Sequence, residues 1–329
     1  MRVNIIGAGV AGLSIATELA FNSDIEIQVF DRAPGLGNAA CSWWAGGMLA
    51  PWCERESAEE PVARLGALAA DWWQKYTGGV TRNGSVVVAL ARDRGELKRF
   101  GRRTDHFETL DAQALGQLEP DLDGRFFSAL YFADEGHLNP RNATAALLAG
   151  LQTRGVTVNF GVDLNDVDAD AVDLTIDCRG LGARDALPDL RGVKGEMLIL
   201  RCPDVQFSRP VRLLHPRMPL YIVPRADNLF MVGATMIESN DRKRISARSM
   251  LELLGAAYAL HPAFGEAEVM EIGVDARPAF PDNLPRLRRI GNTLYANGLF
   301  RHGFLLAPAL AQMARTMVLD NTQVPEFVG

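Results

Sequence analysis

The fold is decided by residues 3–12, which read VNIIGAGVAG. The first four residues predict a buried strand. The glycine-rich turn leads into small and apolar residues at 13–20, which predict a helix. Residues 25–30 alternate like a second strand and end at Asp31. A strand, a G-x-G-x-x-G turn, a helix and an acidic residue about twenty positions further on form the dinucleotide-binding unit.

The glycines and the acid have separate tasks in such a unit. Gly7 permits the tight turn, Gly9 lets the backbone approach a pyrophosphate, and Gly12 lets helix and strand pack closely. The pyrophosphate then lies at the helix N-terminus, where free N–H groups and the dipole favour an anion. Asp31 can accept hydrogen bonds from ribose hydroxyls, and Arg32 beside it is solvated or covers the adenine or pyrophosphate. The alternative is a glycine turn without a ligand, and the unit alone does not separate FAD from NAD.

A second ligand-facing segment follows at residues 42–51, which read SWWAGGMLAP. It is too rich in glycine for a regular helix start and too apolar for an exposed loop. We expect it to lie flat on a ring system. The alternative is a buried turn anchored by Trp43 and Trp44.

The C-terminal part returns to the ligand. Residues 294–298 predict a strand with a glycine exit, 301–304 a loop and 305–318 a helix, so a second helix N-terminus faces a ligand. Two such sites suit FAD better than NAD, because one takes the ADP half and the other meets the flavin edge that becomes negative on reduction. Arg301, His302 and the helix dipole would stabilise that charge. A buried strand at 174–178 ends near Gly180, another place where backbone meets ligand.

The middle of the chain predicts a second domain that interrupts the first. Residues 84–90, 129–132, 220–224 and 229–235 predict strands, the last two joined as a hairpin by residues 226–228. The fold class is therefore an α/β FAD-binding Rossmann-type domain with a mostly parallel sheet, plus an interleaved α+β substrate domain with an antiparallel sheet. We place the FAD-binding domain at 1–75, 137–194 and 268–329, and the substrate domain at 76–136 and 195–267.

Composition narrows the function classes. The 329 residues carry a formal net charge of −6, which argues against nucleic acid and anionic membranes as partners. The chain starts with an apolar strand and has no apolar run of about twenty residues, so we expect a soluble cytoplasmic protein. Its four cysteines form no CxxC pair and no histidine has metal-ligand spacing, which indicates free thiols and no metal site.

Taken together, these motifs resemble the D-amino acid oxidase superfamily, and within it the glycine oxidases of the thiamine (thiazole) pathway. The resemblance spans essentially the whole chain. It rests on the G-x-G-x-x-G turn, AGGML at 45–49, YIVPR at 221–225, VGATM at 232–236, ARP at 276–278 and RHGFLLAP at 301–308.

The resemblance implies a site. The family arginine that binds the substrate carboxylate falls on Arg277, whose planar fork matches a carboxylate in a way that lysine cannot. The carboxylate-holding tyrosine falls on Tyr221, and residues facing the substrate fall on Met48, Met236 and Arg301. The ordinary alternatives are a surface salt bridge for the first, a satisfied strand tyrosine for the second and core packing for the methionines.

The implied cofactor contacts run along the chain. Noncovalent FAD is expected, because the covalent-flavin cysteine of sarcosine oxidases has no match after Cys202. The contacts fall on Gly7, Gly9, Val10, Ala11, Gly12, Asp31, Arg32, Cys41, Ser42, Gly46, Gly47, Met48, Leu164, Gly180, Leu299, Phe300, Arg301, His302, Gly303, Phe304 and Leu305. The sequence departs from the family at Pro219, where a histidine is expected, and at His302, where an asparagine is expected.

The resemblance also implies the reaction: glycine is oxidised to an imine, which gives glyoxylate and ammonia or passes to thiazole synthesis, while oxygen becomes hydrogen peroxide. Three rivals stay open. One is another small substrate such as sarcosine, D-alanine or D-proline. Another is a dehydrogenase with a non-oxygen acceptor, and the last is a flavin-binding module without catalysis. The sequence also leaves open a homo-oligomer and direct transfer of the imine to thiazole synthase.

Overall fold

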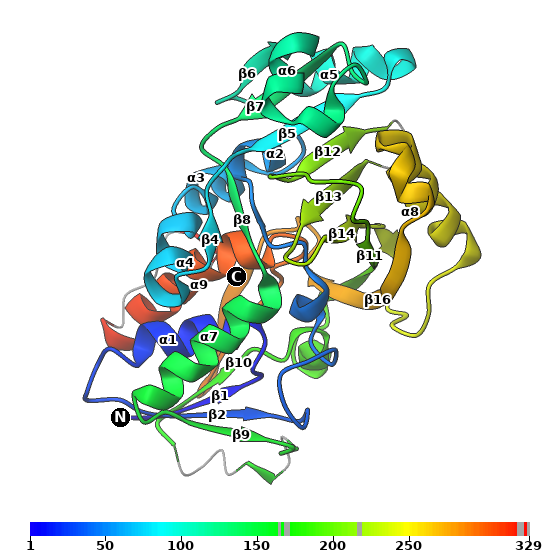
Figure 1. Ribbon diagram of the computed structural model, residues 1–329. Helices are drawn as coiled ribbons and strands as arrows, with labels where there is room; N and C mark the ends of the chain where they lie inside the picture. Colours follow the sequence, from blue (N-terminus) through cyan, green and yellow to red (C-terminus); the bar gives the residue numbers. More distant parts are fainter. Residues whose placement is uncertain (164–165, 168–171, 216–218, 321–325, 328–329) are drawn as a thin grey trace.

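The computed structural model describes residues 1–163, 166–167, 172–215, 219–320 and 326–327. Within these residues the chain forms a six-stranded sheet, a nine-stranded sheet and a small sheet of three strands. The six-stranded sheet lies with α1 and α7 toward the bottom of Figure 1, and the strands β5 to β7 with α5 and α6 lie at the opposite end.

The six-stranded sheet is the expected nucleotide-binding sheet. Its strands run in the order β17-β18-β10-β1-β2-β9, and all neighbours pair in parallel except β17 and β18. The strands are β1 (Arg2–Ile6), β2 (Glu26–Asp31), β9 (Thr157–Phe160), β10 (Leu174–Asp177), β17 (Arg286–Ile290) and β18 (Thr293–Asn297). Helix α1 (Val10–Leu19) is present, but it begins inside the G-x-G-x-x-G segment, three residues before the predicted start at residue 13.

Helices cover this sheet and complete its core. Helix α1 packs on α9 (Gly303–Leu319) and on α7 (Pro140–Thr153), and α4 (Ala69–Thr77) packs on both α9 and α7. Leu13, Ile15 and Leu310 are fully buried in this core. The short helices α2 (Pro51–Glu54) and α3 (Glu60–Gly66) lead from the apolar loop into α4.

The nine-stranded sheet is mostly antiparallel. Its main path is β15-β11-β14-β13-β12-β5-β7-β6, and β16 pairs with β11 along twelve residues. These strands are β5 (Ser85–Ala89), β6 (Glu108–Asp111), β7 (Ser128–Phe132), β11 (Arg191–Arg201), β12 (Val211–Leu214), β13 (Leu220–Pro224), β14 (Leu229–Gly233), β15 (Ile237–Glu238) and β16 (Glu268–Ala279). Its helices are α5 (Arg94–Gly101), α6 (Ala112–Leu118) and α8 (Ala247–Leu260).

The hairpin and one domain limit can be compared with the sequence. Strands β13 and β14 pair antiparallel, and the turn places Asp227 and Asn228 at φ of 60° and 54°, the left-handed pair that suits a tight hairpin. The limit expected at residue 268 differs from the sheet boundary, because β16 belongs to the nine-stranded sheet. No local pattern predicts this pairing, since β11 and β16 lie far apart in the chain.

A sheet of three short strands completes the described fold. Strand β8 (Gly136–Leu138) pairs antiparallel with β3 (Met48–Leu49) and β4 (Val80–Thr81). It ties the apolar loop at 42–51 to the start of α7. Among the described residues, no helix is long and apolar enough to cross a membrane.

Candidate active site

A cavity of about 850 Å³ lies between the two large sheets. The ends of β1, β2 and β18 and the start of α9 form one side, and β11, β14 and β16 contribute to the other. The residues that line it include those of the glycine turn, the loop at 41–48 and the loop at 298–305. Three segments far apart in the sequence therefore meet at one hollow.

The glycine turn leaves room only for backbone. A Cβ on Gly12 would lie 1.9 Å from the carbonyl oxygen of Gly7, and one on Gly7 would lie 2.7 Å from that of Cys178. A Cβ on Gly9 would meet only the Ser42 hydroxyl, at 3.8 Å. The close contacts explain Gly7 and Gly12 by packing, whereas Gly9 faces the cavity, where its missing side chain leaves space for a ligand.

Asp31 closes the turn at the end of β2. Its carboxylate accepts hydrogen bonds from the backbone N–H of Ala8 at 2.7 Å and of Ala33 at 2.8 Å. Each carboxylate oxygen can accept a further bond, and both Asp31 and Arg32 line the cavity. The acid therefore fixes the turn itself and still has capacity for a ribose hydroxyl.

Two helix N-termini face this cavity. Helix α1 is capped by Gly9 and α9 by His302, and neither cap forms a side-chain hydrogen bond. Val10 and Gly303, the first residues of the two helices, both line the cavity. Phe300 holds the turn before α9 at φ 49°. Free N–H groups at both termini favour negative charge, so the cavity fits a pyrophosphate at one end and the reduced flavin ring at the other.

The apolar loop forms a wall of the cavity. Gly47 has φ 69°, and a Cβ there would lie 2.3 Å from the carbonyl oxygen of Leu138. A Cβ on Gly46 would meet the Tyr221 ring at 3.0 Å, and the Arg225 guanidinium donates to the Gly46 carbonyl at 2.5 Å. Burial raises the pKa of the Cys41 thiol to about 12. Cys41 is therefore a neutral wall residue and not a nucleophile.

The expected cofactor residues come together, with two qualifications. Every one of them within the described residues lines the cavity except Gly12, which packs behind the turn. Leu164 lies outside the described residues. This arrangement, with glycine-walled space and two helix N-termini, fits the pyrophosphate and the ring system of FAD.

Arg277 lies flat against the sheet beneath the cavity. It is on β16 opposite Val193, and a Cβ on Gly195 would come within 2.5 Å of its guanidinium atoms. Its Nη1 donates to the carbonyl oxygen of Thr235 at 3.1 Å. No carboxylate of the described residues lies within 4.0 Å of it, and burial lowers its pKa. The Thr235 carbonyl and the strand at Gly195 thus fix the position of the guanidinium, which is partly buried and available to an anion.

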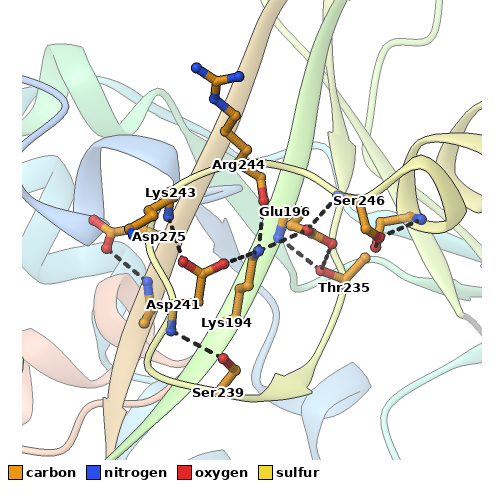
Figure 2. A network of polar contacts seen from close by, with 11 residues as sticks. Lys194, Glu196, Thr235, Ser239, Asp241, Lys243, Arg244, Ser246 and Asp275 are labelled. Carbon is orange, nitrogen blue, oxygen red and sulfur yellow. Dashed lines mark hydrogen bonds and ion pairs between the residues drawn. The ribbon is translucent and has the colours of Figure 1, made fainter.

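A polar network behind Arg277 holds Thr235 in place (Figure 2). The Thr235 hydroxyl donates to Glu196 Oε2 at 3.0 Å and accepts from the Glu196 backbone N–H at 2.9 Å. Lys194 Nζ lies 3.4 Å from Glu196 and 2.8 Å from Asp241, and it also donates to the Arg244 carbonyl at 2.6 Å. Glu196 and Lys194 are buried. Glu196 therefore holds Thr235, whose carbonyl accepts from Arg277, and Lys194 in turn holds Glu196.

The other predicted substrate residues lie around the same space. Tyr221, on β13, and Met48, on β3, line the cavity and are half-buried. Met236 also lines it and is 52% exposed, with its sulfur 3.7 Å from Arg301 Nη1. An exposed thioether beside an arginine is not a core filler, so Met236 belongs to the wall of the cavity.

The sequence reasoning missed a charged cluster beside Arg301. Glu54 Oε2 lies 2.7 Å from Arg301 Nη2 and 3.0 Å from His302 Nε2, and Glu54 Oε1 lies 3.6 Å from Arg212 Nη1. Burial alone would raise the pKa of the Glu54 carboxyl, but these neighbours hold it well below its usual range. Burial lowers the pKa of His302. No spacing signal joins Glu54 to Arg212 or Arg301, because the contacts depend on the tertiary fold.

The described residues contain no group of three or more His, Cys, Asp and Glu side chains that could hold a metal ion. The cavity instead combines glycine-lined space, two helix N-termini and a desolvated arginine. Such groups can bind an anionic cofactor and a carboxylate side by side.

Comparison with known proteins agrees with this geometry. A family model described as FAD dependent oxidoreductase matches residues 2–317. The chain is 56% identical over 326 residues to the thiamine biosynthesis oxidoreductase ThiO of Rhizobium etli, with 98% of each chain covered. It is 29% identical to the bifunctional protein ThiO/ThiG of Synechocystis, where it covers 98% of its own length and 52% of the relative. The glycine oxidase structure from Geobacillus kaustophilus matches with TM-score 0.81 at 23% identity, covering 99% and 96% of the two chains.

Proposed function

The chain belongs to the family of FAD-dependent oxidoreductases, and we propose that it oxidises the CH–NH2 group of a small amino acid to an imine by removing two electrons, with glycine as the first candidate substrate. Membership confirms the resemblance drawn from the sequence motifs and confirms FAD as the cofactor. The names of the relatives, thiamine biosynthesis oxidoreductase and glycine oxidase, support this choice of substrate class.

One observation carries the proposal: Arg277 is a desolvated guanidinium at the cavity wall with no carboxylate of the described chain to neutralise it. A partly buried guanidinium without an ion pair is unfavourable, so an anionic ligand that supplies the pair is stabilised there. The planar fork selects a carboxylate, which every amino acid carries.

The residues around Arg277 would position the substrate for the oxidation. FAD, when bound, accepts the two electrons and the hydrogen that leave the substrate. Arg277 and Tyr221 would hold the carboxylate, and fixing the carboxylate would limit the orientations of the adjacent Cα–H bond and so lower the entropy cost of reaching the reactive one. The amine loses a proton as the C=N bond forms, and solvent at the open, Met236-lined side of the cavity can take it. Water then converts the imine to a 2-oxo acid and ammonia.

The further fate of product and electrons is also part of the proposal. Glycine would give glyoxylate and ammonia, with oxygen reduced to hydrogen peroxide, or its imine would be used for thiazole synthesis. The existence of relatives named ThiO/ThiG, in which an oxidoreductase of this type is one half of a bifunctional protein, supports a link to thiazole synthase. Sarcosine, small D-amino acids and a non-oxygen acceptor are the competing versions of the same chemistry.

The test is anaerobic bleaching of the flavin. The purified holoenzyme is mixed with glycine, sarcosine, D-alanine and D-proline in turn, and the loss of the visible absorbance band is followed. We expect glycine to bleach it, and Arg277→Lys to lower the second-order rate about a hundredfold, because a lysine cannot form the paired hydrogen bonds. Arg289→Lys, at an exposed arginine on β17, is the matched control.

The outcomes distinguish the competing substrates and electron acceptors. Bleaching by another amino acid but not by glycine would move the substrate within the class, and no bleaching by any of them would refute an amino acid oxidase. Oxygen consumption with peroxide formation after air is admitted distinguishes an oxidase from a dehydrogenase.

A further inference from the structure

We propose that Glu54 restricts the substrate chamber to amino acids with a single carboxylate, by occupying the two arginines that would otherwise bind a second one. This inference rests on the proposed function, since it concerns the same chamber. It assigns a role in specificity to a side chain that does not itself hold the reacting carboxylate.

The substrate chamber is the part of the cavity around Met48, Tyr221, Met236, Arg277 and Arg301. Arginines of two kinds lie at this chamber. Arg277 has no ion pair among the described residues, whereas Arg301 and Arg212 share the single carboxylate of Glu54. The Glu54 side chain is 15% exposed and lines the same cavity. Of these three arginines, one is therefore open to a ligand and two are occupied.

The contacts of Arg301 leave little for a ligand. Its Nη2 is engaged by Glu54 at 2.7 Å and by the Ser57 hydroxyl, also at 2.7 Å. Its Nε donates to His302 Nε2 at 3.2 Å, and its Nη1 lies 3.7 Å from the sulfur of Met236. All three nitrogens point at groups of the chain itself, so a second substrate carboxylate would have to displace Glu54.

Arg212 is the second arginine that depends on the negative charge of Glu54. Its side chain is 7% exposed, its Nη1 lies 3.6 Å from Glu54, and its buried Nε has no partner among the described residues. Since burial lowers the pKa of His302, the ring contributes little charge at neutral pH. Two guanidiniums thus face one carboxylate, and removing that carboxylate leaves two uncompensated cations beside the chamber.

The consequence for ligands follows from charge. A second carboxylate near Arg301 meets the negative Glu54, and like charges in a partly desolvated site repel strongly. Without the Glu54 charge the same position becomes a guanidinium fork, which suits a carboxylate. Glycine has no second carboxylate to place there, so its binding relies on Arg277 and Tyr221 and not on Arg301.

The experiment compares inert carboxylates on the flavin-loaded protein. Acetate is titrated against malonate, succinate and glutarate, and binding is read from the perturbation of the visible flavin spectrum. The variants are Glu54→Gln, which removes the charge at constant shape, and Glu54→Asp, which keeps it. Glu56→Gln is the matched control, because Glu56 lies two residues away and pairs with Arg103 instead.

We expect the wild-type protein to bind acetate at least about tenfold more tightly than any of the dicarboxylates. Glu54→Gln should raise the affinity for at least one dicarboxylate relative to acetate by about tenfold. It should also raise the oxidation of iminodiacetate, a glycine with a second carboxymethyl group, relative to glycine. Glu54→Asp and Glu56→Gln should keep the wild-type preference.

Several results would overturn the inference. A wild-type protein that binds a dicarboxylate as tightly as acetate would refute it without any variant, so the test survives a Glu54→Gln protein that does not fold. A shift of equal size in Glu54→Asp would assign Glu54 a packing role only. Failure of acetate to bind any form would refute the Arg277 clamp, and with it the proposed function, whereas unchanged acetate binding with an unchanged ratio in Glu54→Gln refutes the Glu54 inference alone.

Discussion

The two ends of the cavity are built in different ways. The nucleotide end is made of backbone: Gly7, Gly9 and the N-terminus of α1 present N–H groups and empty space. The substrate end is made of long charged side chains, with Arg277 braced by Thr235 and Arg301 held by Glu54. A backbone site is specified by a short run of residues, whereas a side-chain site is specified by contacts between distant segments.

The difference also concerns how each end fails. At Gly7 and Gly12, an added Cβ would clash with a backbone carbonyl oxygen, which cannot rotate away as a side chain can. At the substrate end, each side chain has several neighbours, so the loss of one hydrogen bond is shared by the rest of the network. We therefore expect substitutions at the nucleotide end to have larger effects than substitutions at the substrate end.

The largest effect is expected for Gly12→Ala. A Cβ would lie 1.9 Å from the Gly7 carbonyl oxygen, and we expect a loss of at least about 3 kcal/mol in the free energy of unfolding. FAD should also be lost on gel filtration. Gly150→Ala in α7, where a Cβ meets nothing within 4 Å, should instead stabilise the protein by up to about 1 kcal/mol. Equal retention of FAD by both variants would break the contrast.

An effect of intermediate size is expected beneath the substrate end. Glu135 is buried, its carboxylate accepts from the Cys53 N–H at 2.7 Å and from the Ser85 hydroxyl, and burial raises its pKa to about 7. In the unfolded chain the pKa is near 4.5. Between these values the unfolded chain releases the proton that the folded chain keeps, so this group lowers the free energy of unfolding by up to about 3 kcal/mol as pH rises.

Glu135→Gln removes this titration. The variant should gain stability relative to the wild type between pH 5 and pH 8, measured by denaturant unfolding at each pH. The free energy of unfolding of the variant must be compared with that of the wild type at each pH, because His137 also titrates. Burial lowers the pKa of His137 to about 4, so this group raises the free energy of unfolding as pH rises between about pH 4 and 6.5. A difference that does not change with pH would show that Glu135 is ionised in the folded protein.

The smallest effect is expected for Thr235→Val, which keeps the shape but removes the hydroxyl that contacts Glu196. We expect about a tenfold rise in KM for glycine, because Arg277 loses its fixed carbonyl partner, with about 1 kcal/mol of stability lost. Thr235→Ser should restore the wild-type KM. If Ser and Val behave alike, the network does not position Arg277.

The same contrast explains how much the sequence could predict. The parallel sheet, the glycine turn, Asp31 and the second helix N-terminus follow from local patterns, and the structure confirms them. Arg277 was identified only through the family resemblance, because an arginine before a proline is common on surfaces. Its support by Gly195 could not be predicted, since it depends on the register of β11 against β16.

Glu54 and Arg212 escaped prediction for a related reason. They lie on α2 and β12, and nothing in the spacing of the two residues indicates that they meet. A short helix after an apolar loop gives no periodic signal, and an isolated glutamate in it is ordinarily solvated. Only the folded chain shows that the carboxylate points at two arginines.

The pairing of β16 with β11 has a consequence for protein engineering. Arg277 reaches the chamber from a strand that follows the substrate segment in sequence but belongs to its sheet. A chimera that exchanges substrate halves between relatives by cutting at residue 268 would leave the arginine of one parent facing the glycine position of the other. Grafts that carry residues 191–201 and 268–279 together would transfer Arg277 and the strand that supports it as one unit.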